Sequence, residues 1–118
     1  MDYKFKDNHK LVDDIPEVDP QQVYDNKDSL VLIDVRTPEE FVGELGHIEG
    51  SSLKTLGEDF DSYVHGLDQN KEYVIVCRSG RRSAAATDYM RSQGFSNVYN
   101  MSGGMIYWNE SNLPVEKK

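Results

Sequence analysis

The fold is decided by residues 73–93, which read YVIVCRSGRRSAAATDYMRSQ. Four apolar residues and Cys77 form a continuous run, which is typical of a strand covered on both faces. A short loop of small and basic residues follows, and the alanine-rich stretch over 81–93 favours a helix that Gly94 ends. The segment therefore predicts a strand, a tight loop and a helix, with the thiol of Cys77 at the carboxyl end of the strand.

Strand and helix signals alternate along the rest of the chain. Residues 30–33 form a second continuous apolar run, and shorter strands are expected over 51–53 and 97–100. Helices are expected from Pro20, from Pro38, over 60–67 and after the Gly103-Gly104 turn. Strands and helices that alternate over short links predict an α/β fold. We expect a central, mostly parallel sheet of about five short strands, flanked by helices.

Length and charge limit the organisation and the partners. The 118 residues are 37% hydrophobic, enough for one globular domain, which we place at 17–114 between an N-terminal arm (1–16) and a C-terminal tail (115–118). The net charge of -8 argues against nucleic-acid binding, and the apolar runs are too short to span a membrane. The acidic surface also gives no reason to expect assembly, so we expect a monomer.

The presence of a single cysteine indicates the redox compartment of the protein. Cys77 has no partner for an internal disulfide, which fits a reducing compartment, and we expect the cytoplasm. The first residues, Met1 to Lys6, lack the apolar core and cleavage site of a signal peptide.

The basic loop gives Cys77 its chemistry. Loop amides and the first free N–H groups of the helix converge near the sulfur, and Arg78, Arg81 and Arg82 add fixed positive charge. This surrounding favours the thiolate, the nucleophilic form, so we expect Cys77 to be a reactive anion that solvent reaches. A sulfur closed off from solvent would argue against an enzyme. A buried inert thiol and a solvated basic turn are the alternatives.

Two reactions suit a thiolate in a cationic loop. It can take a sulfane sulfur from an anionic donor and hold it as a persulfide, or it can take a phosphoryl group from an ester. A thioredoxin-like cycle is excluded because Cys77 has no resolving cysteine. Loop length separates the two reactions, since a phosphate brings three oxygens and needs a wider ring of amides.

The loop resembles the active-site loop of the rhodanese sulfurtransferases, Cys-x-x-Gly-x-Arg, in Cys77, Gly80 and Arg82. Cysteine-dependent phosphatases place the arginine one residue later, where this chain has Ser83, so sulfur chemistry is favoured. The resemblance covers about residues 17–112. Three further segments are similar to family signatures in the same order: 32–41, 46–51 and 98–108.

The resemblance implies a role for each loop residue. Cys77 would accept a sulfane sulfur, from thiosulfate for example, and pass it to cyanide or a thiol without a metal or organic cofactor. Arg78 and Arg82 would attract the anionic donor, Gly80 would permit the tight path of the backbone, and Arg81 would add to the positive field. The amides that would cradle the terminal sulfur belong to Arg78, Ser79, Gly80, Arg81, Arg82 and Ser83.

Other polar residues have simpler explanations. Asp34 and Arg36 follow a strand end at the same sheet edge, where an ion pair that braces the loops is the favoured role. Thr37 and Glu40 fit a capping box, and His47 a local hydrogen bond. The histidines and the cysteine share no ligand spacing, so no metal site is expected. Two other functions stay open: a non-catalytic binding or regulatory module with the rhodanese fold, and a cysteine-based phosphatase or arsenate reductase.

Overall fold

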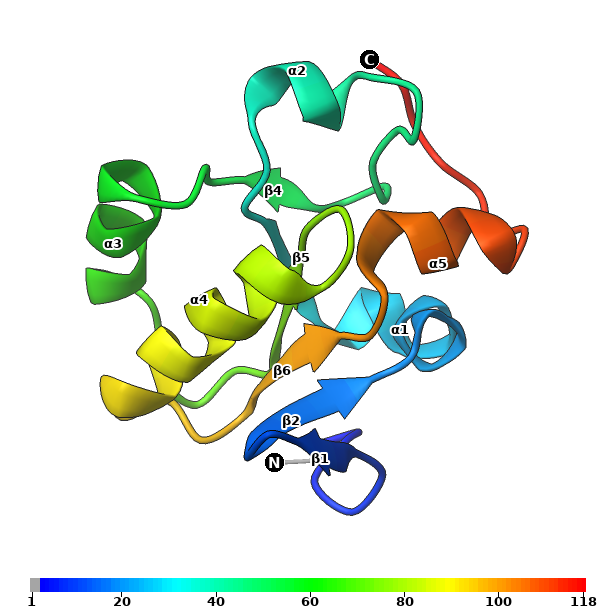
Figure 1. The fold of residues 1–118 in the computed structure, drawn as a ribbon. Helices are drawn as coiled ribbons and strands as arrows, with labels where there is room; N and C mark the ends of the chain where they lie inside the picture. Colours follow the sequence, from blue (N-terminus) through cyan, green and yellow to red (C-terminus); the bar gives the residue numbers. More distant parts are fainter. Residues whose placement is uncertain (1–2) are drawn as a thin grey trace.

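A computed structural model describes residues 3–118 as one six-stranded sheet with helices on both faces (Figure 1). The strands are β1 (Lys10–Val12), β2 (Ile15–Val18), β3 (Val31–Asp34), β4 (Ser52–Leu53), β5 (Tyr73–Val76) and β6 (Val98–Met101). The helices are α1 (Pro20–Asn26), α2 (Pro38–Phe41), α3 (Glu58–His65), α4 (Arg81–Ser92), α5 (Gly104–Glu110) and the short 3-10 helix η1 (Lys27–Ser29). The α/β fold class is confirmed, with one strand more than expected.

The sheet order places β5 in the middle. The strands lie in the order β1-β2-β6-β5-β3-β4, and only β1 runs antiparallel to its neighbour. Ile75 of β5 pairs with Ile33 of β3 on one side and Asn100 of β6 on the other. The carboxyl ends of these three strands therefore meet at one edge. Figure 1 shows the loop after β5 at this edge, between α2 and the start of α5.

Alternate residues of the central strands build two apolar layers. Val74 and Val76 face one layer, with Trp108 of α5 and the residues of α1. Ile75 and Cys77 face the other layer, with Met90 of α4 and residues of α3. Burial on both faces explains why β5 reads as a continuous apolar run. Cys77 directly follows β5, a strand whose four residues are all buried, and this fixes the position of its backbone.

The expected N-terminal arm is largely part of the sheet. β1 and β2 form an antiparallel pair, and β2 continues the sheet beside β6. The buried carboxylate of Glu72 accepts hydrogen bonds from the backbone N–H groups of Lys4 and Phe5, which ties the segment down before β1. Neither β1 nor β2 was among the expected strands. The residues of β1 are all exposed and show no alternation, and β2 contains Pro16, a residue that argues against a strand. Met1 and Asp2, the first residues of the expected arm, lie outside the described residues.

The helix starts follow the sequence signals. Thr37 accepts a hydrogen bond from the N–H of Glu40, and the Glu40 carboxylate accepts one from the N–H of Thr37, which completes the expected capping box.

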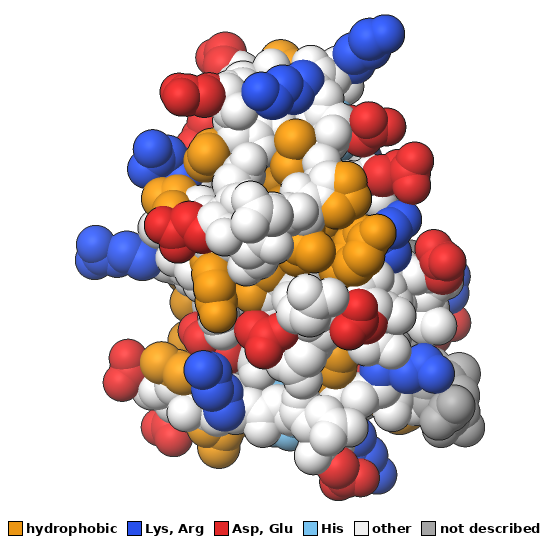
Figure 2. Space-filling model, turned by 90° about the vertical axis from the view of Figure 1, so that its right-hand side faces the viewer, with side chains coloured by type: hydrophobic (Ala, Val, Ile, Leu, Met, Phe, Trp, Pro, Cys, Tyr) orange, Lys and Arg blue, Asp and Glu red, His pale blue; other side chains and the backbone are white. Residues whose placement is uncertain are grey.

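Figure 2 shows the side of the molecule that carries α1 and α5, with apolar side chains grouped in its centre among charged ones. Within residues 3–118, no helix is both long and apolar enough to cross a bilayer.

Candidate active site

Cys77 lies where strand β5 turns into the loop. Its Sγ accepts a hydrogen bond from the N–H of Gly80 at 3.1 Å, so the backbone of the loop contacts the sulfur directly. Gly80 has a φ of 98°, a left-handed conformation, and a Cβ atom there would lie 3.2 Å from the backbone nitrogen of Gly103. The tight path expected at Gly80 thus depends on the absence of a side chain.

The sulfur is less accessible than expected for a nucleophile. Cys77 is only 1% exposed, whereas its neighbours Arg78 and Ser79 are exposed. The expectation that solvent reaches the sulfur does not hold in this conformation, because the loop folds back so that Gly80 contacts Sγ. Reaction at this sulfur therefore needs a movement of the loop or of the side chains around it.

Two buried polar side chains continue from the sulfur into the protein. The Ser83 hydroxyl, in the first turn of α4, lies 3.3 Å from Sγ and 2.5 Å from Oδ1 of Asn100. Both residues are almost completely buried. Ser83 was expected to contribute its amide, but its hydroxyl also reaches the sulfur. Asn100 of β6 was not recognised from the sequence, because a single asparagine in a strand carries no signal of its own.

Arg82 is paired with a carboxylate. Its Nη1 and Nη2 donate to Oε1 and Oε2 of Glu40, both at 2.8 Å, so the two planar groups face each other. The hydrogen bond from Arg82 lowers the pKa of Glu40 to about 2, against the opposing effect of burial. The same bond raises the pKa of Arg82. The local sequence explains Glu40 as part of the capping box. It gives no sign of the bond between Glu40 and Arg82, which are 42 positions apart.

The other arginines of the loop point to solvent. Arg78 and Arg81 are exposed, as expected for groups that attract an anion. Arg78 also borders a cavity of about 260 Å³ on the side of α2. The residues that line this cavity are Arg36, Glu39, Glu40, Gly43, Glu44, Leu45 and Arg78. The lining thus combines two guanidinium groups with three carboxylates.

Asp34 and Arg36 form the expected ion pair at the end of β3. Nε and Nη2 of Arg36 donate to the Asp34 carboxylate, and Nη2 also donates to the carbonyl oxygen of Gly46 at 2.7 Å. Both side chains are 1% exposed. The pair joins the end of the strand to the loop around Gly46, and within residues 3–118 no hydrogen bond joins it to Sγ of Cys77.

The first turn of helix α5 is hydrogen-bonded to the backbone of the loop. The N–H groups of Met105 and Ile106 donate to the carbonyl oxygens of Cys77 and Arg78, at 2.9 and 3.0 Å. A Cβ atom on Gly104 would come within 2.5 Å of these same backbone atoms. The sequence predicts a turn at Gly103-Gly104, but not that Gly104 lies against the loop of Cys77.

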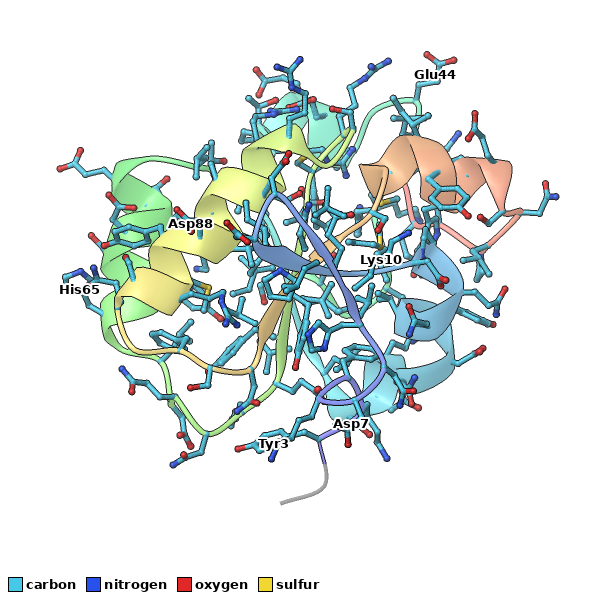
Figure 3. All side chains as sticks on the ribbon, turned by 60° about the horizontal axis from the view of Figure 1, so that its bottom comes forward. Tyr3, Asp7, Lys10, Glu44, His65 and Asp88 are labelled. Atoms are coloured by element: carbon cyan, nitrogen blue, oxygen red, sulfur yellow. The ribbon has the colours of Figure 1, made fainter. Side chains whose placement is uncertain are left out.

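The histidines do not join the site. Nδ1 of His47 lies 2.9 Å from the carbonyl oxygen of Phe41, which is the local hydrogen bond expected for it. Figure 3 shows His65 on the outer side of α3, across the molecule from Glu44. Within residues 3–118, no three His, Cys, Asp or Glu side chains are grouped closely enough to hold a metal ion.

A known family matches most of the chain. The sequence model of the Rhodanese-like domain matches residues 19–111. The chain belongs to this family. The match includes the loop of Cys77, the Asp34–Arg36 pair and the start of α5.

Members of this family similar to the chain include named sulfurtransferases. Thiosulfate sulfurtransferase GlpE of Pseudomonas fluorescens is 35% identical over 86 residues, which cover 73% of this chain and 75% of that protein. The Bacillus subtilis protein named "Putative sulfur carrier protein YrkF" is 40% identical over 97 residues, 80% of this chain, and the chain spans about half of its length (51%).

A solved structure shows the same fold. The polysulfide-sulfur transferase homodimer of Wolinella succinogenes is 30% identical, with a TM-score of 0.72 over 86% of this chain and 78% of that one. At the level of the family, these relatives support a sulfurtransferase.

Proposed function

We propose that this rhodanese-like protein is a sulfurtransferase that carries sulfane sulfur on Cys77. The observation that carries the proposal is the position of Sγ: it ends the central strand, accepts the N–H of Gly80 and lies at the start of α4. The partial positive charge at a helix start favours an anionic sulfur. Arg78 and Arg82 supply full charges that attract an anionic donor.

The reaction has two steps. With thiosulfate as donor, the Cys77 thiolate attacks the outer, sulfane sulfur, the sulfur–sulfur bond of the donor breaks, and sulfite leaves with the bonding electron pair. The product on the protein is a Cys77 persulfide. A cyanide ion or a thiolate then attacks the outer sulfur of the persulfide, which releases the Cys77 thiolate and gives thiocyanate or a new persulfide.

The residues of the loop and its neighbours have different roles in these two steps. The amides from Arg78 to Ser83 would hold the outer sulfur, with Gly80 allowing the backbone to turn around it. Arg78 is free to meet the donor, whereas Arg82 must loosen its contact with Glu40 to do so. Asp34 and Arg36 keep the neighbouring loop in place. Arg81 adds to the local positive potential.

Mass spectrometry of the intact protein tests the proposal. Incubation with thiosulfate should add ~32 daltons, one sulfur atom, and cyanide should remove the addition. Cys77→Ser should gain nothing. A wild-type protein that is folded but never gains this mass, with thiosulfate or with polysulfide, would refute the persulfide mechanism.

The burial of Cys77 favours a second candidate, a binding or regulatory module in which the sulfur does not react. The mass measurement separates the two. A module of this kind would show no sulfur addition and only slow alkylation of Cys77 in the folded state, and it would copurify with a partner protein.

A reducing compartment such as the cytoplasm suits a protein with one unpaired thiol. We also propose a monomer whose one domain extends beyond 17–114 to include β1, β2 and the bridge between Glu116 and His47. Light scattering coupled to size-exclusion chromatography measures the mass in solution.

A further inference from the structure

A chain of hydrogen bonds runs from the Cys77 sulfur to strand β2. It begins at the Ser83 hydroxyl, 3.3 Å from Sγ, and continues to Oδ1 of Asn100 at 2.5 Å. Nδ2 of Asn100 then donates to the Glu17 carboxylate at 2.9 Å, and Glu17 also accepts from the Ser102 hydroxyl. Three separate parts of the chain, β2, α4 and β6, thus meet behind one sulfur atom.

The orientation of the Asn100 amide is fixed. Its Nδ2 faces two oxygen atoms, one of the Glu17 carboxylate and the carbonyl oxygen of Gly80 at 3.0 Å. These groups can only accept, so Nδ2 uses both of its hydrogens on them. Reversing the amide would place Oδ1 against two acceptors in a buried site. Oδ1 therefore points to Ser83 and can only accept from it.

Ser83 has one hydroxyl proton for two neighbours. The 2.5 Å contact with Oδ1 of Asn100 requires that proton, because neither oxygen has another to place between them. The sulfur at 3.3 Å then faces a lone pair of the Ser83 oxygen. A thiol can donate its S–H to this lone pair, whereas a thiolate is repelled by it.

Resting on the proposed function, we propose that Asn100 is a positioning residue that holds the Ser83 hydroxyl away from the Cys77 sulfur. The hydroxyl stabilises the thiolate only when it turns away from Asn100. The sulfur and the Asn100 amide oxygen therefore compete for one hydroxyl proton.

The charged groups around the sulfur either favour its anionic form, are paired with another charge, or reach it only through another residue. Arg82 of α4 would attract a Cys77 thiolate but is bonded to Glu40 of α2. Asp34 and Arg36 neutralise each other at the end of β3. Arg78 is exposed on the loop, and Glu17 of β2 is reached only through Asn100. The Ser83 hydroxyl is thus a local dipole whose direction one side chain controls.

The test is the pH dependence of Cys77 alkylation by iodoacetamide, measured without a sulfur donor. Asn100→Ala removes the competing acceptor, so the midpoint should move about one to two pH units lower, the effect of one hydrogen bond to a charged group. Adding Ser83→Ala to Asn100→Ala should cancel the shift. An Asn100→Ala midpoint that stays in place or rises would overturn the proposal.

Thr87→Val is the matched control. The Thr87 hydroxyl is also buried in α4 and donates to the Ser83 carbonyl at 2.8 Å, but it does not contact the sulfur. Its midpoint should equal that of the wild type, and a shift like that of Asn100→Ala would mean that any disturbance of α4 suffices, against the proposal. If Asn100→Ala does not fold, Glu17→Ala loosens the amide from the less buried end and should move the midpoint in the same direction by a smaller amount.

These measurements are independent of sulfur transfer. A wild-type protein that never gains sulfur refutes the proposed function, yet the alkylation midpoints still decide whether Asn100 competes for the hydroxyl. Conversely, sulfur loading with an unshifted Asn100→Ala midpoint keeps the proposed function and removes the role of Asn100.

Discussion

Replacing Arg82 with alanine separates its binding role from its structural role. In the folded protein, Arg82 makes two hydrogen bonds of 2.8 Å to Glu40, but the two side chains are 39% and 27% exposed. Solvent screens such a pair, so its loss should cost about 0.5–1 kcal/mol of stability. For a domain of this size, that lowers the melting temperature by about 2–6 °C.

The expected effect on sulfur transfer is larger. Loss of a charged hydrogen bond to the anionic donor costs about 1.5–3 kcal/mol, which corresponds to a decrease of about 10- to 150-fold in kcat/KM for thiosulfate. The assay is the rate of thiocyanate formation at several thiosulfate concentrations, with thermal melts of the same samples. Equal free-energy losses in stability and in kcat/KM would contradict the assignment, because they would mean that Arg82 acts only on the fold.

Glu40→Gln tests the same contact from the other side. The amide is neutral and holds Arg82 less strongly, so the guanidinium becomes available to the donor and KM for thiosulfate should fall several-fold. Glu39→Gln is the matched control, since it removes the same charge from an exposed neighbour in the same helical turn. If both variants lower KM equally, the cause is the general reduction of negative charge and not the release of Arg82.

Three further perturbations follow from the contacts around the loop. Gly104→Ala, at a φ of 59° and with its Cβ 2.5 Å from backbone atoms of Arg78, should cost more than about 2 kcal/mol in urea unfolding and prevent the sulfur addition seen by mass spectrometry. Arg36→Leu leaves the Asp34 carboxylate buried without its partner, and urea unfolding should show a loss of about 3–5 kcal/mol. Because the pKa of Glu40 falls from 4.5 to about 2 on folding, its contribution to stability is complete above pH 4.5 and is lost as the pH falls toward 2. The difference in melting temperature between the wild type and Glu40→Gln should therefore shrink over that range, and a constant difference would contradict it.

Local signals in the sequence were sufficient for most of the framework. The capping box at Thr37 and the continuous apolar run of β5 concern residues that are adjacent or one helical turn apart, and both are found as expected. The position of Cys77 at a strand end follows from the same run. β1 could not be found in this way, because its exposed residues do not alternate and it pairs only at the edge of the sheet.

The parts of the site that sequence reasoning missed depend on contacts between distant residues. Glu40 and Arg82 are 42 positions apart, and Glu17 and Asn100 are 83 apart. Each of these residues has an adequate local explanation or no signal at all, so nothing in one sequence links them. The parallel sheet brings them together, since it gathers the ends of β2, β5 and β6 around the start of α4.

These distant contacts have a common effect on the sulfur. Glu40 occupies the guanidinium of Arg82, and Asn100 occupies the hydroxyl of Ser83, so the two side chains best placed to stabilise an anion on Cys77 are both engaged at rest. The restraints differ in kind. An anionic donor competes directly with Glu40 for Arg82, because both present oxygen atoms to the same guanidinium. Asn100 is buried where a donor does not reach it, so the Ser83 hydroxyl breaks its contact with Asn100 only by rotating. If the proposed function and the role of Asn100 both hold, Glu40→Gln changes the dependence of the rate on donor concentration, and Asn100→Ala changes its dependence on pH. The double variant should show both changes independently, because the two contacts share no atoms.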